Sequence, residues 1–260
     1  MTAKNTIEEI KNYGHDIDFS DVFSKSFENY KRIALQAGIV FILFGMVVCS
    51  VVIGTFAAFW CASAITETMD NIKLENLSPI MVLLYILVVS LLSGLVTPIS
   101  AGIMKMADQA SANQEFSIAT AFDYYRSVYF KELFVAPMLI SVFTAGTFTL
   151  LQSVGISALG VFITYVIYFF TFLTIPLIIF GNLKAIDAIQ GSCIIVSKQF
   201  LIILGLLIVA VILSFLGMIG FCIGIFFTLP FLYSTYYCIY DEIIGSGYKS
   251  ELEDIGKPME

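Results

Sequence analysis

The stretch Asn182–Glu242 decides the fold of this chain: NLKAIDAIQGSCIIVSKQFLIILGLLIVAVILSFLGMIGFCIGIFFTLPFLYSTYYCIYDE. It opens with an amphipathic run that ends at Lys198, and no charged residue follows from Gln199 to Tyr240. A bilayer-spanning helix needs about 20 mainly apolar residues, so this uncharged run is long enough for two. The stretch therefore predicts an interfacial helix followed by a transmembrane hairpin, whose returning helix contains Pro230.

The composition extends this interpretation to the whole chain. Of its 260 residues, 59% are hydrophobic and only 13% are charged, and the mean hydropathy is +0.93. Long uncharged runs cover residues 33–66, 76–104, 133–183 and 199–240. The first two runs suit one span each and the last two suit a tight hairpin each. We predict an all-α integral membrane protein with six transmembrane helices in three hairpins.

The basic residues predict the orientation. If the N-terminus is cytoplasmic, every Lys and Arg except Lys73 lies on the cytoplasmic side, as the positive-inside tendency requires. The net charge of −7 does not oppose this, because Asp and Glu carry little weight in that tendency. We expect one membrane domain over residues 18–242, with a polar cytoplasmic tail (1–17) before it and an acidic cytoplasmic tail (243–260) after it.

Three stretches share a common plan, which predicts a repeat over units 18–108, 115–182 and 183–242. Each unit begins with an amphipathic run that ends in a basic residue. In each returning span a threonine shortly precedes a proline, and these prolines are Pro98, Pro176 and Pro230. A shared period indicates repeated structure, although Thr and Pro are both tolerated in membrane helices and chance agreement stays an alternative.

The amphipathic runs are expected to be interfacial helices on the cytoplasmic side. In the first run, Phe19, Val22, Phe23, Phe27 and Tyr30 recur at helical spacing, with charged residues opposite them. Such a stripe is typical of a helix that lies in the membrane surface. The alternative is a helix that packs on the cytoplasmic loops.

No predicted hydrocarbon core contains Asp, Glu, Lys, Arg or His. Buried ionisable groups mark proton relays, ion paths and intramembrane catalysis, so their absence argues against an enzyme or a proton-coupled transporter. The five cysteines lack CxxC spacing, and no phosphate-binding glycine motif is present. We predict no catalytic, cofactor or metal site, and no nucleic-acid partner.

Candidate contacts remain at the cytoplasmic boundary. Asp187 could bind a lipid headgroup or line an entrance, although a local helical ion pair with Lys184 is the favoured alternative. Four tyrosines end the last span: Tyr233, Tyr236, Tyr237 and Tyr240. They could form a stacking surface for a ligand, and an aromatic belt at the interface is the favoured alternative. The three prolines are expected to kink their helices, which could open an inner vestibule or only ease packing.

These features resemble a known group. The residues in common are FSDVFSKSFENYKR at 19–32, the Pro176-containing span before Ala188-Ile-Gln-Gly-Ser192, and the end from Pro230 to Tyr240 with its short acidic tail. They resemble bacterial six-span membrane proteins of unknown function grouped around the membrane domain of glycerophosphoryl diester phosphodiesterase. The resemblance implies a bacterial inner-membrane protein associated with lipid or envelope processes. The soluble phosphodiesterase domain is missing, so its activity is not implied.

The sequence favours a non-enzymatic membrane module that organises lipid or a membrane-protein partner. The alternative is a transporter or permeation path for an apolar or weakly polar solute. Any site should lie where the three units meet. No single residue marks it.

Overall fold

The computed structural model describes residues 3–13, 17–63, 79–219 and 224–245, and every regular element in these ranges is a helix. In chain order they are α1 (Ala3–Tyr13), α2 (Phe19–Ser63), α3 (Pro79–Ser111), the 3-10 helix η3 (Ile118–Arg126), α4 (Phe130–Ser153), α5 (Ser157–Thr171), α6 (Thr174–Ile179), α7 (Ala185–Lys198), α8 (Phe200–Leu216), the 3-10 helix η4 (Gly217–Ile219), α9 (Gly224–Thr228), α10 (Pro230–Tyr240) and the π-helix η5 (Asp241–Gly245). The all-α class is confirmed. Lys73 and most of the acidic tail lie outside the described residues.

Four helices are long and apolar enough to cross a membrane. They are Phe19–Ser50 in α2, Ile80–Ser111 in α3, Phe130–Ser153 and Ser157–Ile179. The pair α7 and α8 also qualifies when taken together, but it is bent by 100° at its break. Within the described ranges there are thus four candidate spans, or five if the bent pair is one span, whereas the sequence predicted six.

The third predicted hairpin is divided at glycine and proline. At Gly217 an added Cβ would lie 2.6 Å from the carbonyl oxygen of Gly224, so the backbones meet at a distance that only glycine permits. The returning segment is then split into α9, of 5 residues, and α10, of 11 residues. Pro230 is the first residue of α10, a position where its missing N–H costs no helical hydrogen bond.

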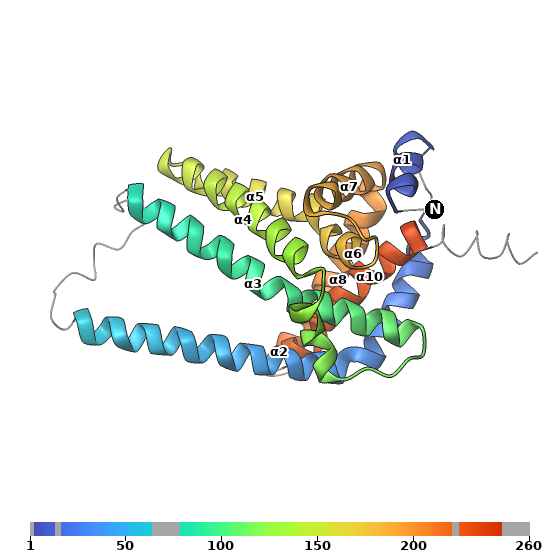
Figure 1. Ribbon diagram of the computed structural model, residues 1–260, viewed down its shortest axis with the longest axis horizontal. Helices are drawn as coiled ribbons and strands as arrows, with labels where there is room; N and C mark the ends of the chain where they lie inside the picture. Colours follow the sequence, from blue (N-terminus) through green and yellow to red (C-terminus); the bar gives the residue numbers. More distant parts are fainter. Residues whose placement is uncertain (1–2, 14–16, 64–78, 220–223, 246–260) are drawn as a thin grey trace, which may run out of the picture.

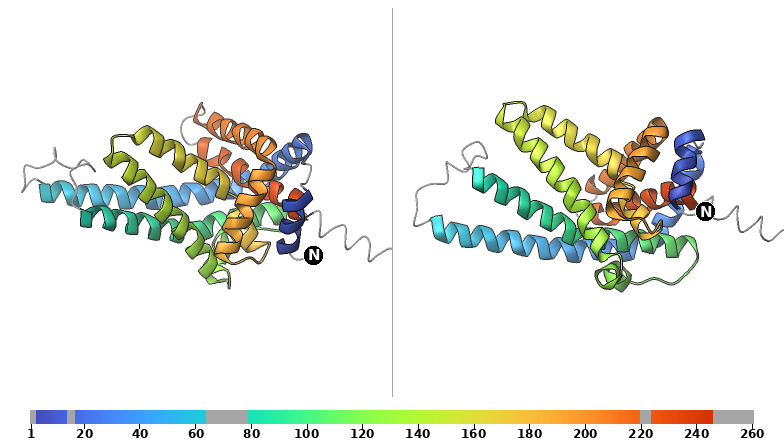
Figure 2. Two further views of the ribbon diagram at one scale, coloured as in Figure 1. Left: turned by 90° about the horizontal axis from the view of Figure 1, so that it is seen from above. Right: turned by 45° about the horizontal axis from the view of Figure 1, so that its top comes forward.

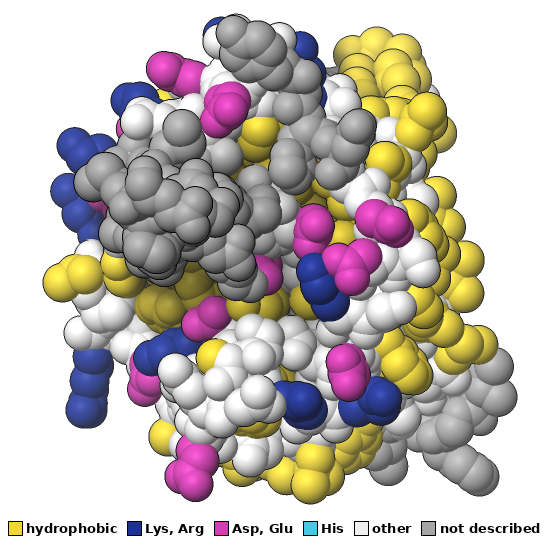
Figure 3. Space-filling model, turned by 90° about the vertical axis from the view of Figure 1, so that its right-hand side faces the viewer, with side chains coloured by type: hydrophobic (Ala, Val, Ile, Leu, Met, Phe, Trp, Pro, Cys, Tyr) yellow, Lys and Arg dark blue, Asp and Glu magenta, His cyan; other side chains and the backbone are white. Residues whose placement is uncertain are grey.

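Charged side chains gather on the end of the molecule that faces the viewer in Figure 3, and apolar side chains lie along one edge of this view. This end carries α1, the start of α2 and the end of α3 (Figure 1). Large apolar side chains are exposed along the flanks, including Val47, Leu83, Phe143 and Val161. This distribution supports a multi-pass, membrane-embedded protein.

The first predicted interfacial helix is not a separate element. α2 continues without a break from Phe19 to Ser63, so this segment and the predicted first span form one helix. Neither Gly nor Pro stands between Phe19 and Gly38, so no residue in this part of the chain ends the helix. The first turns of α2 are inclined to its longer remainder (Figure 1).

The aromatic stripe of these first turns packs on protein. The rings of Phe23, Phe27 and Tyr30 lie 6.1, 6.2 and 5.5 Å from the ring of Phe231 in α10. Edge-to-face ring pairs at such distances are favourable beyond the burial of their area. Part of the stripe therefore packs on α10, while Phe19 and Phe27 stay 40% and 43% exposed.

The amphipathic run that begins the second unit forms the 3-10 helix η3, not the expected amphipathic α-helix. Residues i and i+3 lie on the same side of a 3-10 helix. Accordingly Ala121 and Tyr124 are buried, whereas Phe122 is 45% exposed. The backbone of Ala121 lies against α3, where a Cβ added to Gly102 would come within 2.5 Å of the Ala121 carbonyl carbon.

Only the amphipathic run that begins the third unit forms a separate α-helix. α7 is a separate helix, and the chain turns by 100° into α8 at Gln199. The three amphipathic runs thus differ in local structure, and the threefold repeat stays a prediction.

α10 lies at the centre of the bundle, where it packs against α2, α3 and α8 (Figure 1). Phe231, Ser234 and Ile239 are at most 3% exposed. The Ser234 hydroxyl donates to the carbonyl of Ser26 in α2 at 2.8 Å, which ties the last helix to the first long one.

The N-terminal residues form a docked helix, which differs from the expected polar tail. Ala3, Ile7 and Ile10 share one face of α1 and are buried. This face packs on α7, where a Cβ on Gly191 would lie 2.8 Å from Cδ1 of Ile7. The stripe is visible in the sequence, but the flat glycine surface that receives it is a product of the fold.

Replacing Ile7 with Asp should release α1 from α7. Burying an unpaired carboxylate costs several kcal/mol. A helix as short as α1 has little stability of its own to offset this cost, because its stability comes from packing. In detergent, hydrogen exchange should show protection lost in residues 3–13 and retained in α3 and α4. Glu8→Gln on the exposed face of α1 should keep the protection. Equal protection of α1 in both variants would contradict the docking.

Candidate functional site

Two adjoining cavities form a groove along one flank of the bundle. α4 packs directly against both α3 and α5, with α4 and α5 drawn as a hairpin beside α3 (Figure 2). The outer cavity, of about 300 Å³, lies between these three helices, and the inner one, of about 390 Å³, reaches α6 and α10. Tyr165 and Tyr168 border both cavities. We call the combined space the α3–α5 groove.

Side chains of five helices line the groove. The outer cavity is lined by Tyr85, Val89, Ser141, Thr144, Ala145, Phe148, Val161, Thr164, Tyr165 and Tyr168. The inner cavity is lined by Ser93, Thr97, Ser100, Leu133, Ala136, Pro137, Ile140, Tyr165, Tyr168, Thr171, Phe172, Thr174, Ile175, Ile178, Tyr233 and Tyr236. None of these side chains is charged, so the groove offers hydroxyl groups and apolar surface only.

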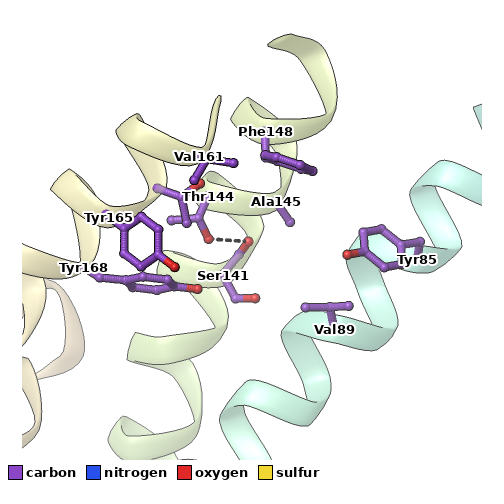
Figure 4. A pocket seen from close by; sticks show the side chains of 10 residues that line it. Tyr85, Val89, Ser141, Thr144, Ala145, Phe148, Val161, Tyr165 and Tyr168 are labelled. Atoms are coloured by element: carbon purple, nitrogen blue, oxygen red, sulfur yellow. Dashed lines mark hydrogen bonds between the residues drawn. The ribbon is translucent and has the colours of Figure 1, made fainter. Parts of the chain in front are cut away.

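The groove is partly open on the apolar flank. Tyr85 on α3 is 41% exposed and Tyr165 on α5 is 70% exposed. Tyr85 and Val89 lie across a gap from Ser141 on α4, and the hydroxyl groups of Tyr85 and Tyr165 point toward this gap from opposite sides (Figure 4). An apolar molecule in the surrounding membrane can therefore reach the groove from the side.

The inner cavity lies where the three sequence units meet. Ser93, Thr97 and Ser100 come from the first unit, the lining residues of α4, α5 and α6 from the second, and Tyr233 and Tyr236 from the third. This is the place at which the sequence led us to expect a site.

A break between α5 and α6 shapes the inner wall, just before Pro176. Ser192 of α7 bridges this break. Its hydroxyl donates to the carbonyl of Phe170 at 2.7 Å and accepts from the N–H of Leu173 at 3.2 Å. One fully buried side chain thus satisfies two backbone groups that the interrupted helix leaves without helical partners.

The threonine hydroxyls of the inner cavity differ in whether they have a hydrogen-bond partner. Thr97 and Thr171 each donate to the carbonyl four residues earlier, at 2.8 Å. Thr174 is 2% exposed, and its Oγ1 has no hydrogen-bond partner among the residues the structure describes. The carbonyl four residues before it belongs to Phe170, which already accepts from Ser192.

The three prolines occupy different settings. Pro98 lies within the unbroken α3, and the hydroxyl of Tyr125 in η3 donates to the Leu95 carbonyl at 2.6 Å, one turn before this proline. Burial raises the pKa of Tyr125. Pro176 and Pro230 each follow a helix break. Two of the three returning segments are therefore interrupted near the proline, and the first is not.

Two of the four C-terminal tyrosines belong to the groove. The Tyr233 hydroxyl lies 3.4 Å from the Ser100 hydroxyl, within hydrogen-bond distance. The Tyr236 ring lies 4.9 Å from the ring of Phe172. Both tyrosines line the inner cavity, so they face the interior of the bundle.

The other two tyrosines are buried at the charged end. Tyr237 donates to Asp108 Oδ1 at 2.9 Å and pairs with the Ser111 hydroxyl at 2.9 Å. Phe180 packs on both Tyr237 and Tyr240, with ring centres 5.6 and 5.5 Å apart. Since α10 is enclosed by other helices, these tyrosines join helices rather than form the expected aromatic belt.

Lys184 and Asp187 do not form the ion pair favoured by the sequence. The ion pairs in the described part of the chain join Lys25 to Asp21 and Glu242, and Lys105 to Asp123. Lys184 is the N-cap of α7 and has extended backbone angles, so it lies outside the helical spacing that such a pair needs. Asp187 lies in the first turn, where its charge favours the helix N-terminus. Neither residue lines the groove.

Sequence reasoning did not select Tyr165, Tyr168 or Ser192 as site residues. The two tyrosines are three residues apart in an otherwise apolar span, and this spacing was the available signal. For Ser192 no local signal exists, because its two partners lie about 20 residues earlier, at the break between α5 and α6. No protein-family model, curated protein or solved structure matches this chain, so the functional argument rests on the groove itself.

Proposed function

We propose that this protein is a non-enzymatic, lipid-organising membrane module that holds one lipid molecule in the α3–α5 groove. The observation that carries the proposal is an uncharged groove that opens on the apolar flank of the bundle. Pockets of roughly 300–1,000 Å³ with apolar walls and a few polar groups are typical of small-molecule sites. The cavity volumes lie in this range, and the side opening suits a ligand that arrives from the bilayer.

The proposal includes a membrane topology of six spans in three hairpins. α8 would be the fifth span and α9 with α10 the sixth, while α7 would lie in the interface. Both termini would be in the cytoplasm, and the membrane would be the bacterial inner membrane. The gathering of charged side chains at one end supports this arrangement, because charges avoid the apolar core.

Filling the groove should remove the lipid. Ala145 lines the outer cavity, so Ala145→Trp should occlude it and lower lipid occupancy about tenfold, which corresponds to about 1.4 kcal/mol. The measurement is native mass spectrometry of protein purified in mild detergent, with the bound lipid extracted and quantified.

Val142→Trp is the matched control, since Val142 lies on the same helix, is 42% exposed and lines none of the cavities named above. It should keep wild-type occupancy. Equal lipid occupancy in the two variants, with both proteins folded by thermal melting, would reject the groove as the lipid site.

The second candidate is a permeation path for an apolar or weakly polar solute. It is favoured by the adjacency of the two cavities, which share Tyr165 and Tyr168 in their walls. In vesicles, a permeation path would give a protein-dependent flux of such a solute that Ala145→Trp abolishes. A lipid-holding module gives no such flux.

A further inference from the structure

We infer that the inner end of the α3–α5 groove binds the uncharged polar head of a neutral lipid, and that the hydroxyl of Thr174 forms a hydrogen bond with it. This inference rests on the proposed function and names the ligand class of the same site. It follows from the hydrogen bonds of the threonines and from the charges of the lining.

The threonines that precede the three prolines differ in their hydrogen bonds. Thr97 donates to the carbonyl of Ser93 at 2.8 Å, and Thr228 donates to the carbonyl of Ser214 at 2.5 Å. Thr174 alone of these three has no partner in the described part of the structure. The difference coincides with the break before Pro176, where the carbonyl of Phe170, four residues before Thr174, accepts from Ser192.

An unpaired hydroxyl in this position is costly. Leaving a buried donor unsatisfied costs about 1–3 kcal/mol, and native structures contain few such groups. Thr174 borders the inner cavity, so a ligand oxygen there is the natural partner. A threonine hydroxyl and methyl exchange places by rotation about χ1, so the hydroxyl can turn to a ligand without movement of the backbone.

The lining of the inner cavity selects an uncharged head. The phosphate of a phospholipid headgroup is typically bound by Arg or Lys side chains. The inner cavity contains neither kind of side chain. Its hydroxyl groups, including that of Tyr233, match the hydroxyl and ester carbonyl oxygens of a neutral lipid. The outer cavity, with Phe148 and Val161, then receives the acyl chain.

The test compares two lipids with identical acyl chains, dioleoylglycerol and dioleoylphosphatidic acid, by thermal shift and native mass spectrometry of the full chain. The wild type should bind dioleoylglycerol more tightly, and Thr174→Val should weaken this binding about tenfold. Without lipid, Thr174→Val should melt no lower than the wild type, because it removes an unpaired polar group. Thr174→Ser keeps the hydroxyl and should restore binding.

Thr149→Val is the matched control, because Thr149 donates to the carbonyl of Ala145 and its side chain does not line the groove. It should bind dioleoylglycerol as the wild type does. Undiminished binding by Thr174→Val, or equal binding of both lipids by the wild type, would overturn the inference and leave the lipid-holding function standing. Failure of the wild type to bind either lipid, together with equal occupancy in Ala145→Trp and Val142→Trp, would overturn the proposed function itself.

Discussion

Replacing Ser192 with alanine should destabilise the protein by about 2–4 kcal/mol, because two buried backbone groups lose their partner at once. The carbonyl of Phe170 and the N–H of Leu173 both depend on this hydroxyl. They lie at a helix break in an apolar bundle, where water cannot easily replace the lost hydrogen bonds. Equilibrium unfolding in mixed detergent micelles measures the change in the free energy of unfolding.

Ser197→Ala is the control on the same helix. The Ser197 hydroxyl donates to the carbonyl of Cys193, and its side chain is exposed. Its loss should change the free energy of unfolding by no more than about 0.5 kcal/mol. If Ser192→Ala were equally mild, the bridging role of Ser192 would be wrong.

Replacing Gly102 with alanine should also destabilise strongly, by about 3 kcal/mol. The new Cβ would lie 2.5 Å from the carbonyl carbon of Ala121, a backbone atom that cannot rotate away. α3 and η3 would have to separate, and the buried contacts of Tyr124 in η3 would be lost with them. Thermal melting in detergent should show a clear decrease in Tm.

Gly146→Ala should have the opposite sign. Gly146 lies inside α4, and an added Cβ there meets no atom within 4 Å. Alanine in a helix interior is more favourable than glycine by about 0.5–1 kcal/mol. The two variants carry the same chemical change, so equal effects would show that the approach of η3 to α3 is not close.

The sequence predicted the helical class and the main apolar segments. α3, α4 and the pair α5–α6 lie where the uncharged runs placed the second, third and fourth spans. The tight hairpin predicted within residues 133–183 is also found, and it turns at Gln152–Gly155 with Gly155 at φ +81°. These features depend on local apolar length and on glycine, which are visible in one chain segment at a time.

The amphipathic runs that begin the units were harder to predict. α2 continues through its expected boundary because no breaker ends it, and η3 winds as a 3-10 helix whose Ala121 lies against Gly102. An apolar stripe shows that a helix has a covered face, but it does not show whether lipid or protein covers it. The ring of Phe23 illustrates this, since it packs on Phe231 of α10.

By itself the sequence determined that this chain forms apolar helices and gathers its charges at one end, because both follow from the order of residue types along the chain. The tertiary structure alone decided that α10 lies at the centre and that α3, α4 and α5 leave a groove between them. It also decided that the hydroxyl of Ser192 bonds to the Phe170 carbonyl at the helix break, and that Thr174 has no hydrogen-bond partner among the described residues. The physical reason is that a hydrogen bond between helices depends on their packing, and three similar Thr–Pro segments can therefore have different partners.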